Sequence, residues 1–145
     1  MTVDRELVAI RLARVREHLR HLRRLGGMSR EEFFASATEQ HAVERELQVI
    51  IEACLDIGHH VIAREGLRRP TDYRDVFTSL REAGVLDADL GGRLETMAGF
   101  RNRLVHGYLD VQPERVYDIA TNDLADIEAF ASRIVARYVA GQPVK

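Results

Sequence analysis

Apolar residues recur at steps of three and four along nearly the whole of this 145-residue chain, and no segment alternates convincingly with a period of two. Steps of three and four place apolar side chains on one face of an α-helix, whereas a half-buried strand needs strict alternation. The pattern therefore restricts the chain to helices. Because short loops favour antiparallel neighbours, we predict an all-α, antiparallel up-and-down bundle of about five helices.

Capping residues and helix breakers predict where these helices begin and end. Ser29 and Ser36 each stand three residues before a glutamate, which is the pattern of a capping box. The first opens only a short turn, and the second opens the longest helix. We expect helices at about residues 3–25, 37–65, 72–83, 88–106 and 114–138, with further caps at Thr71 and Asp87 and breaks at Gly66, Gly84 and Gly107.

The composition is that of a soluble globular protein, with 46% apolar and 30% charged residues. No apolar run approaches the roughly 18 residues that cross a bilayer. The N-terminus carries no apolar secretion segment, so we expect a cytoplasmic protein without membrane contact. We expect one domain over residues 1–140 and a flexible tail over residues 141–145. Cys54 lies alone on an apolar stripe, which indicates a core residue and not a disulfide partner.

Charge is unevenly distributed along the chain. A net charge of −2 argues against a protein that coats nucleic acid by bulk electrostatics. The first expected helix nevertheless concentrates basic side chains. They are Arg11, Arg14, Arg16, His18, Arg20, His21, Arg23 and Arg24. This face is either a solvated surface with carboxylate partners elsewhere or a surface for phosphate or an acidic partner.

Residues 101–108 read Arg-Asn-Arg-Leu-Val-His-Gly-Tyr and carry most of the chemistry in the chain. Arginine offers a permanent cationic fork suited to phosphate. Histidine is the side chain whose ordinary pKa suits proton transfer near neutrality. Arg101 also stands where the helical period requires a core residue, and an inward charge needs a partner or a ligand. These residues indicate a site that binds or cuts a phosphodiester without a metal.

Arg101 and His106 are about 140° apart on an ideal helix, so a regular helix does not point both at one site. Either the last turn before Gly107 loosens, or the site joins residues from two chains. Cleaving RNA by attack of the 2′-OH needs both a base and an acid, and the motif offers one histidine. A two-fold dimer supplies two histidines and two arginines around one phosphate. We therefore predict a homodimer.

The spacing Arg-x4-His-x-Tyr resembles the signature of the HEPN superfamily, and most closely that of HepT-like toxins of the HEPN/MNT group. Segments 44–48, 51–60, 74–77 and 97–100 extend the similarity over roughly residues 40–135. The resemblance implies a dimeric HEPN-like helical domain with metal-independent endoribonuclease activity on RNA. It also implies a partner, the minimal nucleotidyltransferase (MNT, MntA-type) antitoxin that neutralises the toxin.

The resemblance also assigns roles to single residues. Arg101 would hold the phosphate and stabilise its developing charge. His106 would be the acid or base, and Asn102 would orient either the phosphate or the histidine. Tyr108 matches the tyrosine that accepts AMP groups from the antitoxin, becoming O-AMP-tyrosine. The other interpretation of Tyr108 is structural, as a residue that caps the end of the bundle.

Two further expectations concern the surroundings of the motif. Arg45 either lines the cleft from the longest helix or forms a salt bridge within that helix. With a single cysteine and no His-x3-His pair, we expect no metal site and no cofactor. The alternative function, from a different class, is a non-catalytic nucleotide-binding or scaffold subunit that partners a nucleotidyltransferase.

Overall fold

The computed structural model describes residues 2–106 and 111–140, which form seven α-helices and contain no strand. The helices are α1 (Arg5–Arg23), α2 (Arg30–Phe34), α3 (Ala37–Glu65), α4 (Tyr73–Glu82), α5 (Ala88–Val105), α6 (Pro113–Asn122) and α7 (Leu124–Ile134). The expected all-α bundle is confirmed. Within these ranges no helix combines the length and apolar character that crossing a membrane demands. The expected tail, residues 141–145, lies outside the described residues, so the division at residue 140 stays a prediction.

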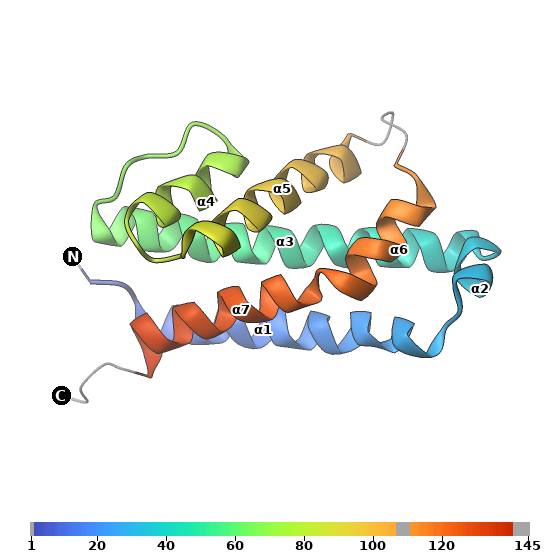
Figure 1. Ribbon diagram of the computed structural model, residues 1–145. Coiled ribbons are helices and arrows are strands. Elements are labelled where there is room, and N and C mark those ends of the chain that lie inside the picture. Colours follow the sequence, from blue (N-terminus) through green and yellow to red (C-terminus); the bar gives the residue numbers. More distant parts are fainter. Residues whose placement is uncertain (1, 107–110, 141–145) are drawn as a thin grey trace.

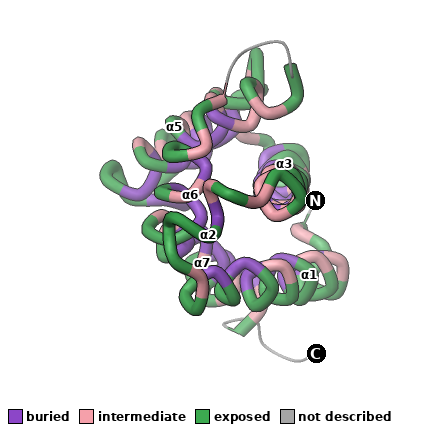
Figure 2. The backbone as a smooth tube through the Cα atoms, turned by 90° about the vertical axis from the view of Figure 1, so that its right-hand side faces the viewer, coloured by how far each residue is buried: buried purple, intermediate pink, exposed green. Residues whose placement is uncertain are grey.

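The long helices lie side by side along one axis (Figure 1). α1 and α3 run in opposite directions. α6 and α7 follow one another, and α7 lies beside α1 and runs in the direction opposite to it. α4 and α5 form a helical hairpin against α3, on the side away from α1. In the end-on view of Figure 2, buried stretches face the space between the helices and exposed stretches face outward. A single apolar core therefore lies between the helices, as expected from one apolar stripe on each.

Local capping explains where most helices begin. Ser29 forms the expected capping box with Glu32, and the side chains of Ser36 and Asp87 accept hydrogen bonds from the first turns of α3 and α5. The predicted cap of α4 at Thr71 is wrong by one residue. Asp72 caps this helix, because its carboxylate accepts the main-chain N–H of Asp75 at 2.8 Å.

The last predicted helix is divided in two at Asp123, whose φ and ψ of −99° and 1° interrupt the α-helix between α6 and α7. Asparagine and aspartate compete with the helical backbone for hydrogen bonds, and Asn122 and Asp123 stand together at this point. The apolar stripe continues through the break. Its buried members are Val116, Ile119, Ala120, Leu124, Ile127, Phe130, Ala131, Ile134 and Tyr138.

α3 and α4 approach closely at Gly58. A Cβ added there would lie 2.7 Å from Cγ1 of Val76, so only a residue without a side chain lets α4 pack at this distance. Val76 lies one helical turn after Tyr73, the first residue of α4. The contact at Gly58 therefore sets the position of Tyr73 relative to α3 and α5.

Cys54 lies in the core on α3, as its place on the apolar stripe predicts, with 2% of its surface exposed. Burial raises the pKa of its thiol to about 12. The thiol is therefore protonated at neutral pH and acts as a small apolar core residue.

Candidate functional site

Arg101 projects from the last turns of α5 into the space between α3 and α4, and only 12% of its side chain is exposed. Its Nε and Nη2 donate hydrogen bonds to Oε1 of Glu52, at 3.1 and 2.6 Å. Its Nη1 donates to Oδ1 of Asn102 at 3.2 Å. The guanidinium also lies over the ring of Tyr73, 4.4 Å from its centroid. The inward charge predicted from the helical period is thus present, and specific side-chain contacts hold it in place.

Glu52 provides the negative charge opposite Arg101 from the middle of α3. Burial alone would raise its pKa, but hydrogen bonds from Arg101 and Gln48 and the nearby charges of Arg101 and Arg45 outweigh burial and lower it. Glu52 is therefore ionised at neutral pH and holds the guanidinium in place.

Arg101 keeps hydrogen-bonding capacity after these contacts. A guanidinium carries five N–H groups. Among the described residues, the hydrogen bonds to Glu52 and Asn102 occupy three of them, which leaves two for a further acceptor. A phosphate oxygen is an acceptor of this kind, and charge on both partners strengthens such a bond.

His106 ends α5 as its C-cap residue, with an exposed side chain. Its main-chain N–H donates to the carbonyl oxygen of Asn102 at 3.1 Å, but its ψ of 77° leaves the helical region. Arg101 points inward and His106 lies at the exposed end of the same helix. This agrees with the expectation that a regular α5 does not point both side chains at one place.

The other predicted site residues lie in different surroundings. Asn102 contacts Arg101 through its side-chain oxygen, so it orients the arginine, a role not anticipated. Arg45 is exposed on α3 and stands seven residues, about two helical turns, before Glu52. It therefore shares a face of α3 with Glu52, whose pKa its charge lowers. Tyr108 lies outside the described residues.

Sequence reasoning missed Glu52 and Tyr73 as parts of this site. A signal for Glu52 was available, because an arginine on a core stripe requires a carboxylate from a facing helix. The chain offers several such carboxylates, and 49 residues separate this pair. Tyr73 is 42% exposed, and the guanidinium of Arg101 lies over its ring.

In the described part of the chain, no three His, Cys, Asp or Glu side chains are grouped so that they could hold a metal ion. The chemistry near Arg101 is that of a cation, a carboxylate, an amide and an aromatic ring. These groups suit the binding of a negatively charged ligand at a partly buried guanidinium.

A family model described as "Ribonuclease HepT-like" matches residues 15–134. The chain belongs to the HepT-like ribonuclease family. This confirms the resemblance inferred from the Arg-x4-His-x-Tyr spacing, and with it the expected class of activity. It also shows that the match includes the first helix from residue 15 onward, beyond the segment in which the resemblance was seen.

Individual HepT-like relatives agree with this assignment. The chain is 28% identical over 115 residues to the tRNA nuclease HepT of Aphanizomenon flos-aquae, covering 79% of this chain and 78% of that protein. It is 28% identical over 131 residues to the mRNA nuclease HepT of Shewanella oneidensis, covering 90% and 98%. Among solved structures, the tri-AMPylated HEPN toxin of Shewanella oneidensis in complex with an MNT antitoxin matches with a TM-score of 0.84 and 28% identity. That match covers 90% of this chain and 97% of the toxin.

Proposed function

We propose that this HepT-like protein is the toxin of a toxin–antitoxin pair and cleaves RNA without a metal, using Arg101 and His106. The observation that carries the proposal is the environment of Arg101. Its guanidinium is fixed by Glu52, Asn102 and Tyr73 yet keeps N–H groups for a phosphate. Relatives named as nucleases of tRNA and of mRNA support RNA as the substrate class.

The proposed reaction is attack of a ribose 2′-OH on the neighbouring phosphorus. The new O–P bond forms as the bond to the 5′-oxygen breaks, which leaves a 2′,3′-cyclic phosphate. Arg101 stabilises the charge that develops on the phosphoryl oxygens. One His106 removes the 2′-OH proton, and a second protonates the departing 5′-oxygen. The second histidine comes from another copy of the chain.

Exposed apolar side chains support the homodimer. The described residues expose three large apolar side chains, and two of them, Tyr73 and Val105, lie near the motif. Tyr73 covers Arg101, and Val105 is the last residue of α5. A second copy docked against this end of α5 would cover both and bring the two motifs together.

One experiment tests cleavage and pairing together. Labelled RNA is incubated in EDTA with the parent protein and with His106→Ala, Val105→Asp and Ile10→Asp. The parent should cleave, and His106→Ala should lose at least about 100-fold in rate. Val105→Asp should become monomeric by light scattering and inactive. Ile10→Asp is the matched control because Ile10 is also exposed but lies on α1, so it should remain dimeric and active.

Other results would contradict the proposal. A parent protein that binds nucleotide but leaves RNA intact would favour the scaffold function instead. An active monomer would remove the need for a second histidine.

We also propose that a nucleotidyltransferase antitoxin neutralises this protein by AMPylating Tyr108. The structure of a tri-AMPylated relative with an MNT antitoxin supports this step. The phenol oxygen attacks the α-phosphate of ATP, the new O–P bond forms, and pyrophosphate leaves. Each added AMP brings a negative charge that competes with RNA for Arg101. Intact-mass spectrometry after co-expression should show additions in AMP units that Tyr108→Phe lacks; an unmodified but fully neutralised toxin would refute modification at this residue.

A further inference from the structure

A cationic groove lies between α4, α5 and α6, on a different face of α5 from Arg101. Its volume is about 210 Å³, and its lining residues are Arg74, Thr96, Gly99, Phe100, Arg103 and Arg115. Three of the six carry a permanent positive charge and none is acidic. The groove is therefore positively charged although the net charge of the chain is −2.

In the part of the chain that the structure describes, the three arginines of the cationic groove form no ion pair, unlike neighbouring arginines. On α4 and α5, Arg81 pairs with Glu95, Arg93 with Asp126 and Arg101 with Glu52. In contrast, within residues 2–106 and 111–140 no carboxylate forms an ion pair with any of the three groove arginines. Asp123 lies close enough to Arg115 to interact with its charge, and the two line a neighbouring groove. The charge of Arg115 is therefore partly balanced, whereas no described carboxylate balances those of Arg74 and Arg103, which are available to a ligand.

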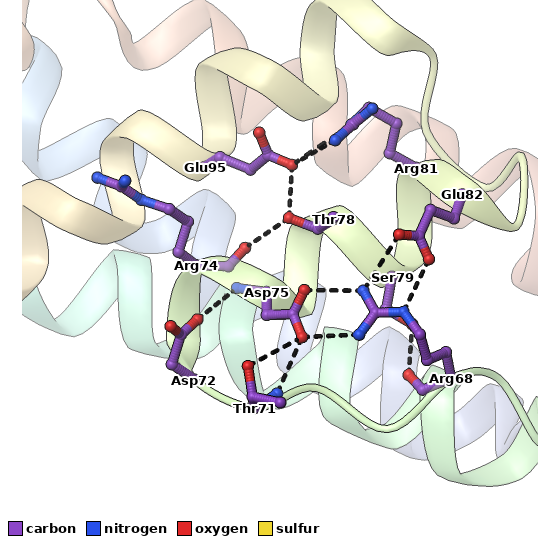
Figure 3. A network of polar contacts seen from close by, with 10 residues as sticks. All are labelled: Arg68, Thr71, Asp72, Arg74, Asp75, Thr78, Ser79, Arg81, Glu82 and Glu95. Carbon is purple, nitrogen blue, oxygen red and sulfur yellow. Dashed lines mark hydrogen bonds and ion pairs between the residues drawn. The ribbon is translucent and has the colours of Figure 1, made fainter.

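Gly99 gives Arg74 its place in the groove. A Cβ at this position of α5 would collide with Nη2 of Arg74, so the guanidinium lies directly over the backbone of α5. Figure 3 shows Arg74 extending toward α5 and away from the polar network around Asp75. On the other side of the groove, the guanidinium of Arg115 lies 6.0 Å from the centroid of the Phe100 ring.

The groove lies on the side of α5 on which His106 stands, although His106 does not line it. Thr96, Gly99, Arg103 and His106 follow one another at steps of three and four, which keeps them on one side of the helix. At a rise of about 1.5 Å per residue, roughly 10 Å separates Gly99 from His106 along the axis. A strand that lies in the groove therefore reaches the end of α5 where His106 stands.

We propose that this groove binds the phosphodiester backbone of single-stranded RNA and leads it to His106. Guanidinium groups bind phosphate by charge-assisted hydrogen bonds without reading the bases, so the groove supplies affinity but no sequence preference. The inference rests on the proposed ribonuclease function, and it assigns a substrate-binding surface to residues outside the Arg-x4-His-x-Tyr motif.

The test measures binding of a labelled, mixed-sequence RNA of about 20 nucleotides by fluorescence anisotropy, on full-length protein carrying His106→Ala so that RNA stays intact. Arg74→Ala, Arg103→Ala and Arg115→Ala should each weaken binding about fivefold. The triple variant should lower the slope of log affinity against log salt by about 2, since each phosphate contact to a single strand contributes about 0.7.

Gly99→Ala provides a test that changes no charge. Alanine should shift the guanidinium of Arg74 but keep its charge, so RNA binding should weaken by less than it does in Arg74→Ala. Alanine is favoured over glycine inside a helix, so the variant should melt no lower than the parent. Weak binding by a stable protein would locate the effect at the groove and not in the fold.

A matched control removes the same charge elsewhere. Arg14, Arg16 and Arg20 are exposed on α1, which lies on the opposite side of the bundle from α5 (Figure 1). Replacing these three with alanine should leave most of the affinity and slope. Equal losses in both triple variants, or parental binding by the groove variant, would overturn the inference. If the protein that keeps His106 fails to cleave RNA in EDTA while the groove variants still weaken RNA binding, only the proposed catalytic function is wrong.

Discussion

Two arginines in this bundle face carboxylates in different ways. Arg68, in the loop between α3 and α4, forms four hydrogen bonds to two carboxylates, those of Asp75 and Glu82 (Figure 3). Its side chain is 44% exposed. Arg101 is 12% exposed and uses a single carboxylate oxygen, that of Glu52. The more buried arginine therefore has fewer carboxylate contacts.

This difference separates a structural contact from a candidate site. At Arg68 two negative charges surround one positive charge, so the cluster has no surplus attraction for an anion. It fixes the loop before α4, where the hydroxyl of Ser79 also donates to the carbonyl oxygen of Arg68 at 2.6 Å. At Arg101 one carboxylate balances one guanidinium, and Arg45 adds a positive charge nearby. Of these two arginines, only Arg101 has surroundings that favour the binding of a phosphate.

Replacing each arginine with alanine should show the largest difference. Arg101→Ala should lower the rate of RNA cleavage at least about 100-fold, because it removes the group that stabilises the developing charge. Arg68→Ala should cleave within about twofold of the parent, because its cluster lies outside the site. Initial rates in EDTA, normalised to folded protein by circular dichroism, measure both. Equal losses of cleavage rate in the two variants would contradict the different roles of Arg101 and Arg68.

Glu52→Gln should have an intermediate effect. The glutamine keeps the shape but loses the charge that holds Arg101, so cleavage should fall about tenfold while RNA still binds. Glu52→Asp should restore part of the rate, which a merely space-filling role would not explain. The pKa of Glu52 is lowered in the folded protein, so its contribution to stability is present above its ordinary value of 4.5 and disappears as the pH falls below it. The parent should therefore lose stability below pH 4.5 more steeply than Glu52→Gln.

Asp75→Asn should have the smallest effect, and on stability alone. Hydrogen bonds from Arg68 and from the main-chain N–H of Thr71 hold the pKa of Asp75 well below its ordinary value of 3.8. The carboxylate is thus charged and stabilising above pH 3.8, and its contribution is lost as the pH falls toward the lowered pKa. The variant should melt about 3 °C below the parent at pH 7, with cleavage unchanged. A loss of cleavage without a loss of stability would link this loop to the site.

Local signals predicted much of the fold. Ser36 and Asp87 were recognised as caps because the interaction lies within one helical turn, and Arg101 was recognised as inward from the spacing of its own helix. The sequence pattern does not predict the break at Asp123, because the apolar stripe continues across it. The sequence does not predict Glu52 as the partner of Arg101, because the two residues are 49 positions apart. Which of several carboxylates faces Arg101 depends on how two helices pack. Side-chain pairing between helices is not encoded in the period of either one.

The glycine at position 58 has a consequence for the genetics of this protein. Cells that survive expression of an active toxin select for alleles that disable it. Such alleles need not change any residue that touches RNA. Any larger residue at Gly58 would push against Val76, shift α4 and carry Tyr73 away from Arg101. A screen of surviving cells should therefore recover inactive variants that are substituted at Gly58 and keep every residue of the Arg-x4-His motif.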